Sequence, residues 1–326
     1  MNIQSKNILF ISPEFFGVDK EIISSLRKLG ANVIWFDERA VKSSFGRAVN
    51  SINPALFNCY SNEYYKNQIE TIPGDIDIIL VIKGDMITPK TIDRFRNRWP
   101  KAELILYLYD PVINIHGIES KLSLYDRVIS FEPKDCNKYG FEFRPLFSDF
   151  SNTDSVGNNE FDICFYGTMY GDRFDIVYQV RELCKKKCMK FYSFCFLRGK
   201  FMAFYYMVTN RGFRKLGLKS ISFKAKSASE LSNIIKKSKI ILDANDINQQ
   251  GLTIRTLETL LSGKKMITTN SDIANYDFYN PNNILIVNRD HISIPDSFFE
   301  SEYETISEEV LSKYTAMGWI KDVFKL

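Results

Sequence analysis

Histidine, cysteine clusters and long apolar runs are all scarce in this sequence, and each shortage argues against a class of protein. The 326 residues include two histidines, His116 and His291, and six scattered cysteines. So few histidines argue against a Ser-His-Asp or Cys-His hydrolase, unless one of the two is the base. Cys184 and Cys188 lie four residues apart, but no second cysteine pair or neighbouring histidine completes a zinc-type ligand set. We therefore expect no metal site.

The apolar runs are short. The longest conspicuous one, residues 201–208, has eight residues, whereas a membrane-spanning helix needs ~20. The first ten residues, MNIQSKNILF, lead directly into a strand pattern without the apolar stretch of a secretory signal. We therefore expect a cytoplasmic protein. Hydrophobic residues make up 45% of the chain and charged residues 25%, as in ordinary globular proteins.

Alternating strand and helix patterns predict two α/β domains in series. Residues 147–160, FSDFSNTDSVGNNE, are rich in Ser, Asn, Asp and Gly and form the best linker candidate. We therefore place a first Rossmann-like domain at 1–150 and a second at 160–311, followed by a C-terminal helix at about 312–326. Near-continuous apolar runs predict parallel strands of the first domain at 7–12, 32–36, 76–82, 104–109 and 127–131.

The most informative segment is 240–270, which has the pattern of a strand, a polar loop, a helix and a second strand. The polar loop covers 243–250, and Gly251 is expected to open the helix. Leucines at 252, 257, 260 and 261 form its apolar stripe, and Gly263 is placed to end it. In a parallel sheet such a loop lies at the carboxyl edge, where free N–H groups of the first helical turn favour an anion.

A second glycine-containing loop follows the strand at 161–166. It contains Gly167, Thr168 and Gly171 and leads to Arg173. Glycines let the backbone approach a diphosphate, and arginine can neutralise it. A plain strand-to-helix turn explains these residues equally well, but both loops are expected at the carboxyl edge of one sheet, where Arg255 adds positive charge.

The segment 240–270 resembles the donor-binding segment of GT-B glycosyltransferases, especially bacterial polysaccharide and spore-maturation-type enzymes of the glycosyl transferases group 1 kind. Many members have two glutamates eight positions apart; here the second matches Glu258 and the first falls on Gln250. The resemblance implies two Rossmann-like domains that face each other across a cleft, with Glu258 on the nucleotide ribose. The implied donor-binding residues are Gly167, Thr168, Arg173, Gln250, Gly251, Leu252, Thr253, Arg255 and Glu258. The alternative is an ordinary amphipathic helix on which Glu258 is solvated.

This resemblance implies a hexosyltransferase-like glycosyltransferase that needs neither metal nor cofactor. It would move a sugar from a nucleotide-sugar donor, with a UDP-sugar as the first guess, to a glycan or lipid-linked acceptor of bacterial surface polysaccharide such as lipopolysaccharide or capsule. Gln250 in place of the first glutamate leaves the sugar contacts and the stereochemical outcome open. Two alternatives remain: a non-catalytic nucleotide- or sugar-binding partner of an assembly enzyme, and a GT-B-type epimerase.

Acceptor-side candidates lie at strand ends of the first domain. Asp110 ends LILYLYD and precedes Pro111, and it is our first choice of general base for the acceptor hydroxyl. The alternative is that Asp110 caps the following turn. Glu14 is the second catalytic candidate and His116 another possible base. Gly17, Lys83 and Asp85 are the acceptor-binding candidates. Asp75 and Asp77 have the Asp-x-Asp spacing of some metal sites, but their position before a strand favours turn and strand-entry roles.

Positive charge is concentrated between 181 and 226. This segment holds thirteen Lys or Arg residues and one acid, Glu182, whereas the whole chain carries a net charge of only +4. Aromatic residues are interleaved with the cations, a composition suited to an anionic membrane surface. We expect peripheral attachment to the inner face of the plasma membrane and, lacking a nucleic-acid-binding motif, no nucleic-acid partner. A solvated basic helix followed by buried aromatics is the alternative.

Overall fold

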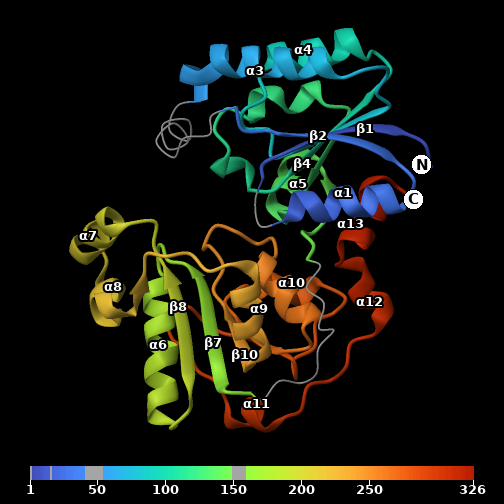
Figure 1. Cartoon of the computed structure of the whole chain (residues 1–326). Coiled ribbons are helices and arrows are strands. Elements are labelled where there is room, and N and C mark those ends of the chain that lie inside the picture. Colours follow the sequence, from blue (N-terminus) through green and yellow to red (C-terminus); the bar gives the residue numbers. More distant parts are fainter. Residues whose placement is uncertain (1, 15–16, 41–53, 149–158) are drawn as a thin grey trace. The chain divides into compact units, whose positions relative to one another are not determined.

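This structure is a computed structural model, and it describes residues 2–14, 17–40, 54–148 and 159–326. The chain divides into two compact units (Figure 1). Unit 1 comprises Met1–Phe147 and Thr315–Leu326, and unit 2 comprises Ser148–Tyr314. Most of the predicted linker at 147–160 lies outside the described residues. Each unit is presented separately below.

Unit 1 is built on a six-stranded parallel sheet with strand order β2-β1-β3-β4-β5-β6. Its strands are β1 (Asn7–Ser12), β2 (Asn32–Asp37), β3 (Ile78–Ile82), β4 (Glu103–Leu108), β5 (Arg127–Ser130) and β6 (Glu142–Phe143). Its helices are α1 (Val18–Lys28), α3 (Asn58–Thr71), α4 (Pro89–Arg98), α5 (Pro133–Tyr139) and α13 (Ala316–Val323), with 3-10 turns η1 (Pro54–Phe57), η2 (Val112–Asn114) and η3 (Glu119–Leu124).

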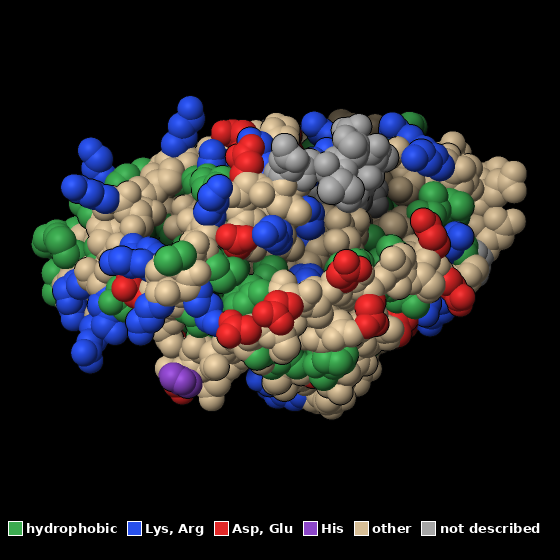
Figure 2. Space-filling view, turned by 90° about the horizontal axis from the view of Figure 1, so that it is seen from below, with side chains coloured by type: hydrophobic (Ala, Val, Ile, Leu, Met, Phe, Trp, Pro, Cys, Tyr) green, Lys and Arg blue, Asp and Glu red, His purple; other side chains and the backbone are tan. Residues whose placement is uncertain are grey.

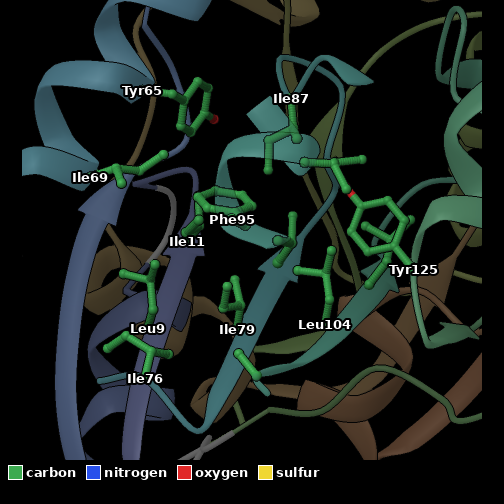
Figure 3. Close-up of a cluster of buried hydrophobic side chains, with 14 of the residues drawn as sticks. Leu9, Ile11, Tyr65, Ile69, Ile76, Ile79, Ile87, Phe95, Leu104 and Tyr125 are labelled. Atoms are coloured by element: carbon green, nitrogen blue, oxygen red, sulfur yellow. The ribbon is translucent and has the colours of Figure 1, made fainter. Parts of the chain in front are cut away.

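Helices cover both faces of this sheet: α3 and α4 lie side by side over one face, and α1 and α13 over the other (Figure 1). All five residues of β3 are buried, as expected for an apolar strand covered on both faces. Figure 3 shows strand residues such as Leu9 and Ile79 beneath Tyr65 of α3 and Phe95 of α4. The hydrophobic core therefore fills the layer between the sheet and these two helices.

The C-terminal helix α13 completes the core of unit 1. Trp319 is fully buried, and its ring centroid lies 4.8 Å from that of Tyr107 on β4 and 5.3 Å from that of Phe147. Arg127 of β5 donates a hydrogen bond to the carbonyl oxygen of Val323 at 2.9 Å. Residues from the extreme end of the chain thus fill space against strands more than a hundred residues earlier.

Unit 2 also has a six-stranded parallel sheet, with strand order β12-β11-β10-β7-β8-β9. Its strands are β7 (Phe161–Thr168), β8 (Phe191–Phe196), β9 (Ile221–Ser222), β10 (Ser238–Asp243), β11 (Lys265–Thr268) and β12 (Ile284–Ile286). Its helices are α6 (Arg173–Lys186), α7 (Lys200–Thr209), α8 (Arg211–Leu216), α9 (Ala228–Lys236), α10 (Ile254–Leu261), α11 (Asp296–Glu300) and α12 (Glu308–Lys313), with turns η4 (Leu218–Ser220) and η5 (Ser271–Asn275).

Side chains of β7 alternate between two buried layers of unit 2. Ile163 and Phe165 belong to the core that includes α6, whereas Cys164 and Tyr166 pack with Ile235 of α9. Numbered from β7, the strand order is 3-2-1-4-5-6, the arrangement of a dinucleotide-binding Rossmann fold. The order in which successive strands are added to the sheet therefore reverses between β7 and β10.

Two predicted helix boundaries are wrong. The C-terminal helix predicted at about 312–326 is α13, which begins at Ala316 because Thr315 is its N-cap. Helix α10 begins at Ile254 rather than at Gly251, because Thr253 is its N-cap and its hydroxyl accepts a hydrogen bond from the backbone N–H of Thr256. Its predicted end is confirmed, since Gly263 has the left-handed φ of 62° that a helix-terminating glycine adopts.

Replacing Trp319 by Ala tests the contribution of α13 to unit 1. Removing a fully buried indole that contacts Tyr107 and Phe147 should lower the free energy of unfolding by about 3–5 kcal/mol. Urea unfolding followed by circular dichroism measures the change. Ile113→Ala, at a side chain 78% exposed in the same unit, is the control and should change stability by less than about 0.5 kcal/mol. Equal effects in both variants would contradict this packing role.

Candidate functional site

The candidate site of unit 2 lies where the strand order of its sheet reverses. β7 and β10 pair in parallel at this point, with β8 and β9 on one side and β11 and β12 on the other. Ligands of open α/β sheets bind at the carboxyl ends of the strands beside such a reversal. β7 is longer than the predicted strand at 161–166 and ends with Gly167 and Thr168, and the loop after it leads to Arg173, the first residue of α6. The loop after β10 leads to α10. The prediction that both loops lie at one edge of one sheet is confirmed.

A buried carboxylate, Asp243 at the end of β10, organises this edge. It is fully buried and accepts hydrogen bonds from the hydroxyls of Thr253 and Thr256, each at 2.9 Å. The Arg255 guanidinium donates to the same carboxylate at 3.0 Å. All three donors belong to the start of α10, so Asp243 fixes that helix end to the sheet. Sequence reasoning placed Asp243 only at the start of a polar loop.

Arg255 crosses the end of β7 at Gly167. A Cβ atom on Gly167 would lie 2.2 Å from Nη2 of Arg255, so no other residue fits there without moving the guanidinium. The Arg255 guanidinium carbon lies 5.0 Å from the ring centroids of both Phe165 and Tyr166. Its Nε atom is buried without a hydrogen-bond partner. The glycine therefore makes room for a cation, and that cation retains an unused donor.

Arg173, the first residue of α6, is the second cation at this edge. Its side chain donates to the carbonyl oxygen of Thr168 at 2.9 Å and lies 4.0 Å above the Tyr170 ring, and its residue is only 7% exposed. Its Nε is buried without a partner, and Arg173 forms no ion pair within the described part of the chain. Burial lowers the pKa of Arg173, and the nearby charge of Arg255 lowers it further. Two desolvated guanidinium groups thus converge where an anion would stabilise both.

Glu258 lies on α10 and contacts β7. Its Oε2 accepts a hydrogen bond from the Tyr166 hydroxyl at 2.6 Å, and burial raises the pKa of its carboxyl group. The alternative interpretation of Glu258 as a solvated helix residue is therefore wrong. Tyr166, buried among the residues that pack on α9, was not singled out from the sequence, although it is the last large side chain of its strand.

The remaining predicted donor-side residues differ in which of their atoms a ligand could reach. Leu252 is fully buried in the core, so only its backbone is available to a ligand. The carbonyl oxygen of Gln250 accepts from the side-chain amide of Asn270 at 2.8 Å, and that of Gly251 accepts from Gln249 at 2.8 Å. Thr168 is exposed at the end of β7. The two hydrogen bonds to carbonyl oxygens fix the backbone of the loop before α10.

Four polar residues that the sequence did not single out connect the surrounding loops. Arg289, after β12, donates to the Asp172 carboxylate at 2.8 Å and to the carbonyl oxygen of Asn245 at 2.9 Å. Asn245 also accepts from the Thr269 hydroxyl at 2.7 Å. The only available signal was that each residue follows a strand or precedes a helix at the same edge.

Unit 1 brings together three of the predicted acceptor-side residues. Nζ of Lys83 lies 3.3 Å from Asp110 and 3.6 Å from Asp85. Burial alone would lower the pKa of Lys83, but the charges of Asp85 and Asp110 outweigh it and raise the pKa. Lys83 also has a positive φ of 76°, a conformation that is strained for a residue with a side chain.

The structure also bears on the other acceptor-side candidates and on the alternative that Asp110 caps the turn after it. The backbone N–H of Val112, in the turn after Asp110, is bonded to the Asp135 carboxylate at 2.8 Å. Asp110 is therefore not the acceptor for that N–H group, and among the described residues its carboxylate is paired with Lys83. Glu14 is exposed, and its carbonyl oxygen accepts from the Arg39 guanidinium. Gly17 has a φ of 81° as the N-cap of α1. His116 is exposed.

A buried glutamate, Glu38, lies beside this cluster and was missed in the sequence. It is fully buried; its Oε1 accepts from the backbone N–H of Met86 at 3.2 Å, and its Oε2 has no hydrogen-bond partner. Burial, followed by the charge of Asp85, raises the pKa of Glu38 well above its usual range. Lys121 anchors the same loop by donating to the carbonyl oxygens of Gly84 at 2.9 Å and Ile87 at 2.7 Å. The only sequence signal for Glu38 was an acid just after a strand.

The Asp-x-Asp pair has the structural role expected of it. Asp77, at the amino end of β3, accepts from Nζ of Lys6 at 2.7 Å and from the backbone N–H of Asn7 at 2.8 Å. It therefore joins two strands at the sheet edge opposite the strand ends that carry Lys83 and Asp110. Within residues 2–14, 17–40, 54–148 and 159–326, no group of three or more His, Cys, Asp and Glu side chains is placed to hold a metal ion.

Solved structures supply the comparison for this architecture. A lipopolysaccharide outer core galactosyltransferase, WaaB, in its apo form aligns with a TM-score of 0.58 over 98% of this chain and 100% of its own, at 14% identity. An α-glucosyltransferase in complex with UDP and a 13-mer DNA containing an HMU base aligns with a TM-score of 0.62 over 98% and 95%, at 15% identity. The chain has the GT-B fold.

A third GT-B match is the catalytic domain of starch synthase IV from Arabidopsis thaliana bound to ADP and acarbose. Its TM-score is 0.57 over 99% of this chain and 98% of its own, at 8% identity. No protein-family model and no curated protein sequence matches the chain. At these identities the likeness shows the GT-B fold alone, since one fold hosts many activities.

Glu38→Gln tests the protonation of the buried carboxyl group in this GT-B chain. A carboxyl group with a raised folded-state pKa binds more protons in the folded than in the unfolded state, so the stability of the protein falls as pH rises through that window. Glutamine resembles the protonated acid and does not titrate. We expect the variant to gain stability over the wild type as pH rises above about 4.3, the ordinary pKa of a glutamate side chain.

Urea unfolding at a series of pH values measures the difference in the free energy of unfolding. Glu63→Gln, at an exposed carboxylate of α3, is the control and should show no pH-dependent gain. A difference between Glu38→Gln and wild type that is the same at every pH would show that Glu38 does not hold an extra proton in the folded state.

Proposed function

We propose that this protein is a hexosyltransferase-like glycosyltransferase that takes its sugar from a nucleotide-sugar donor. The observation that carries the proposal is the pair of buried guanidinium groups, Arg173 and Arg255, at the point where the strand order of the second sheet reverses. Each has a buried Nε without a partner, and burial and mutual repulsion disfavour the charge of Arg173. A diphosphate would supply acceptor oxygens and negative charge to both.

In this proposal unit 2 is the donor-binding domain, covering about 160–311, and its residues divide the donor between them. Arg173, Arg255 and the first turn of α10 bind the diphosphate, with Gly167 and Gly251 providing close backbone approach. The loop that holds Gln250, Leu252 and Thr253 faces the sugar, and Glu258 accepts hydrogen bonds from the ribose hydroxyls. Charge on the departing diphosphate is then stabilised by arginines and backbone N–H groups without a required metal.

Unit 1 is proposed to bind the acceptor, with Asp110 as the general base. The carboxylate of Asp110 is nearly half exposed and lies beside the Lys83 ammonium group, so a hydroxyl group can reach it. Asp110 takes the hydroxyl proton as the acceptor oxygen bonds to the anomeric carbon and the bond from that carbon to the diphosphate breaks. Asp85 and Lys83 contact the acceptor, and Glu14 with Gly17 extends this surface.

The proposed biological role is assembly of bacterial surface polysaccharide, such as lipopolysaccharide or capsule, on a glycan or lipid-linked acceptor. WaaB, whose structure is similar, is a lipopolysaccharide outer core galactosyltransferase, and UDP is bound in the structure of the similar α-glucosyltransferase. A UDP-sugar is therefore the first donor to test. We place the protein in the cytoplasm, attached to the inner face of the plasma membrane through the basic segment 181–226.

Thermal shift with a panel of UDP, GDP, CMP and dTDP sugars tests the donor site. We expect one nucleotide class to raise the melting temperature selectively, and Glu258→Ala to abolish this rise because the ribose loses its acceptor. Glu258→Gln should retain part of it, since an amide oxygen still accepts a hydrogen bond. Glu300→Ala, at an exposed carboxylate of the same unit, should leave it unchanged.

Stabilisation by none of the donors would contradict the transferase proposal. Selective stabilisation without hydrolysis or transfer of the sugar would favour the alternative of a non-catalytic nucleotide- or sugar-binding partner of an assembly enzyme. Conversion of the donor to a different sugar nucleotide in the absence of acceptor would identify an epimerase instead.

Arg173→Met separates a ligand-binding role from a structural one. The change removes a desolvated cation beside Arg255 and keeps an apolar side chain of similar length, so we expect the melting temperature without ligand to be maintained or raised. Loss of charge-assisted hydrogen bonds of ~1.5–3 kcal/mol should weaken nucleotide binding by about tenfold or more. Calorimetric titration with the stabilising nucleotide measures it.

Lys239→Met is the matched control, because Lys239 is a cation on β10 near its amino end, far along the strand from Asp243, and is paired with Asp162 at 2.8 Å. The affinity of the Lys239→Met variant for the nucleotide should equal that of the wild type. A lowered melting temperature with unchanged nucleotide affinity in Arg173→Met would assign that arginine a purely structural role.

A further inference from the structure

Helix α7 carries an apolar stripe that faces away from the protein. Phe201, Phe204, Tyr205 and Val208 follow the i, i+3, i+4, i+7 spacing of a single helix face. Phe201 is 80% exposed, Phe204 60% and Val208 65%. In a globular protein a stripe with this spacing normally faces the core. We call these four exposed residues the outer face of α7.

The inner side of α7 already has its packing partners, so the outer face is not a misplaced core face. Ala203 is buried, and the Tyr206 ring centroid lies 5.0 Å from that of Phe174 on α6. Turning the helix to bury the outer face would expose these contacts. The apolar outer face is therefore a built feature of the surface, and large exposed apolar groups of this kind mark interaction sites.

Helix α8 follows α7 in the chain and packs closely on α6. A Cβ atom on Gly212 of α8 would lie 2.6 Å from the Asp175 carboxyl group on α6, so the two helices are in close contact. Phe213 is buried with its ring centroid 5.4 Å from that of Phe174. Asn210, between α7 and α8, caps α8 and donates from its side-chain amide to the carbonyl oxygen of Gly171 at 2.8 Å. The corner between α7 and α8 is thus joined to the glycine loop after β7 by a hydrogen bond.

Positive charge predominates around the outer face, and Asp175 of α6 is paired with one of the cations, Lys215, at 3.6 Å. No Asp or Glu occurs between Glu182 and Glu230. Figure 2 shows Lys and Arg side chains gathered with hydrophobic side chains at the end of unit 2 where Figure 1 places α7 and α8. The exposed cations that flank the helix in the chain are Arg198, Lys200, Arg211, Arg214, Lys215 and Lys219.

This combination distinguishes the possible occupants of the surface. A protein partner would have to supply an acidic rim around an apolar groove, whereas a bilayer with acidic lipids offers both an apolar layer and negative charge without further design. Aromatic and aliphatic side chains on one helix face with cations around it are typical of helices that lie in the membrane interface. At ten residues α7 is far too short to span a bilayer, and none of the helices in the described residues is long and apolar enough to do so.

We propose that the outer face of α7 inserts into the interfacial layer of an anionic membrane, with the flanking cations bound to acidic lipid headgroups. The proposal rests on the attachment proposed above for 181–226 and assigns it to one helix. Because Asn210 joins the α7–α8 corner to Gly171, insertion also holds the loop between β7 and Arg173 close to the lipid surface. A lipid-linked acceptor would be presented at that same surface.

Vesicle flotation of the full chain tests this assignment. Wild type should float with vesicles of phosphatidylglycerol and phosphatidylcholine at low salt, and much less with pure phosphatidylcholine. The triple variant Phe201→Ser/Phe204→Ser/Val208→Ser should lower the partition coefficient by about tenfold or more, because three exposed apolar side chains no longer enter the bilayer. Its melting temperature should match that of the wild type, since those side chains have little contact with the core.

Ile113→Ser, at an equally exposed apolar residue of unit 1, is the control and should float like the wild type. Lys200→Glu/Arg211→Glu should also reduce flotation, and the attraction that remains in the triple variant should vanish at about 0.5 M salt, where exposed charges are screened. Absence of wild-type flotation at low salt would overturn the proposal, as would unchanged flotation of the triple variant.

A different result would assign the outer face to another occupant. If wild type does not float and sediments as a dimer, whereas the triple variant sediments as a monomer, the face binds a second copy of the chain and the membrane assignment is overturned. The thermal shift with nucleotide sugars needs no vesicles, so loss of flotation with intact donor stabilisation overturns only the membrane face. Flotation without donor stabilisation overturns only the transferase proposal.

Discussion

The buried carboxylate of Asp243 is the interaction on which the arrangement of the candidate donor site depends. A charge in the protein interior is tolerated only when it is paired and hydrogen-bonded. Asp243 meets this requirement through Thr253, Arg255 and Thr256, which all lie at the start of α10. Satisfying one carboxylate therefore attaches a helix to the end of β10 and directs Arg255 across Gly167. The same pairing leaves Arg255 with one unused donor.

Both units keep like charges close together at the carboxyl edge of a sheet. In unit 2 these are the guanidinium groups of Arg173 and Arg255, and in unit 1 the carboxyl groups of Glu38 and Asp85. Each arrangement includes a buried polar atom without a partner, which is unfavourable for folding. Groups held in this way cluster at functional sites because a ligand or a proton can relieve the repulsion. The strained backbone of Lys83 lies beside the second arrangement.

The aromatic residues of the basic segment show how burial changes the interpretation of a composition. Phe194 is buried in a strand, and Tyr206 packs on Phe174, as the alternative of buried aromatics requires. Phe201 and Phe204 lie on the opposite side of α7 and are exposed. Composition gives all four residues the same weight, whereas the place of Phe194 in β8 and the side of α7 on which α6 packs separate them. The outer face of α7 contains the most exposed aromatic side chain of this segment, Phe201.

Five strands of unit 1, the glycine that ends α10 and the placement of two loops at one sheet edge were predictable from the sequence, whereas β6, β8 and β9 were not predicted. The predictable features depend on apolar periodicity and on backbone conformations that one or two residues impose. The start of α10 was predicted too early, because Thr253 accepts an N–H hydrogen bond as the N-cap while its hydroxyl donates to Asp243, ten residues earlier in the chain.

Partners far apart in the chain were decided only by the tertiary structure. Lys83 with Asp110, Tyr166 with Glu258, and Trp319 with Tyr107 are contacts between different elements. Their pairing follows from the strand order of each sheet and from the helices that pack on it. Local sequence sets which side chain a strand end presents, but the strand and helix packed beside it determine whether that side chain meets a partner, a like charge or solvent.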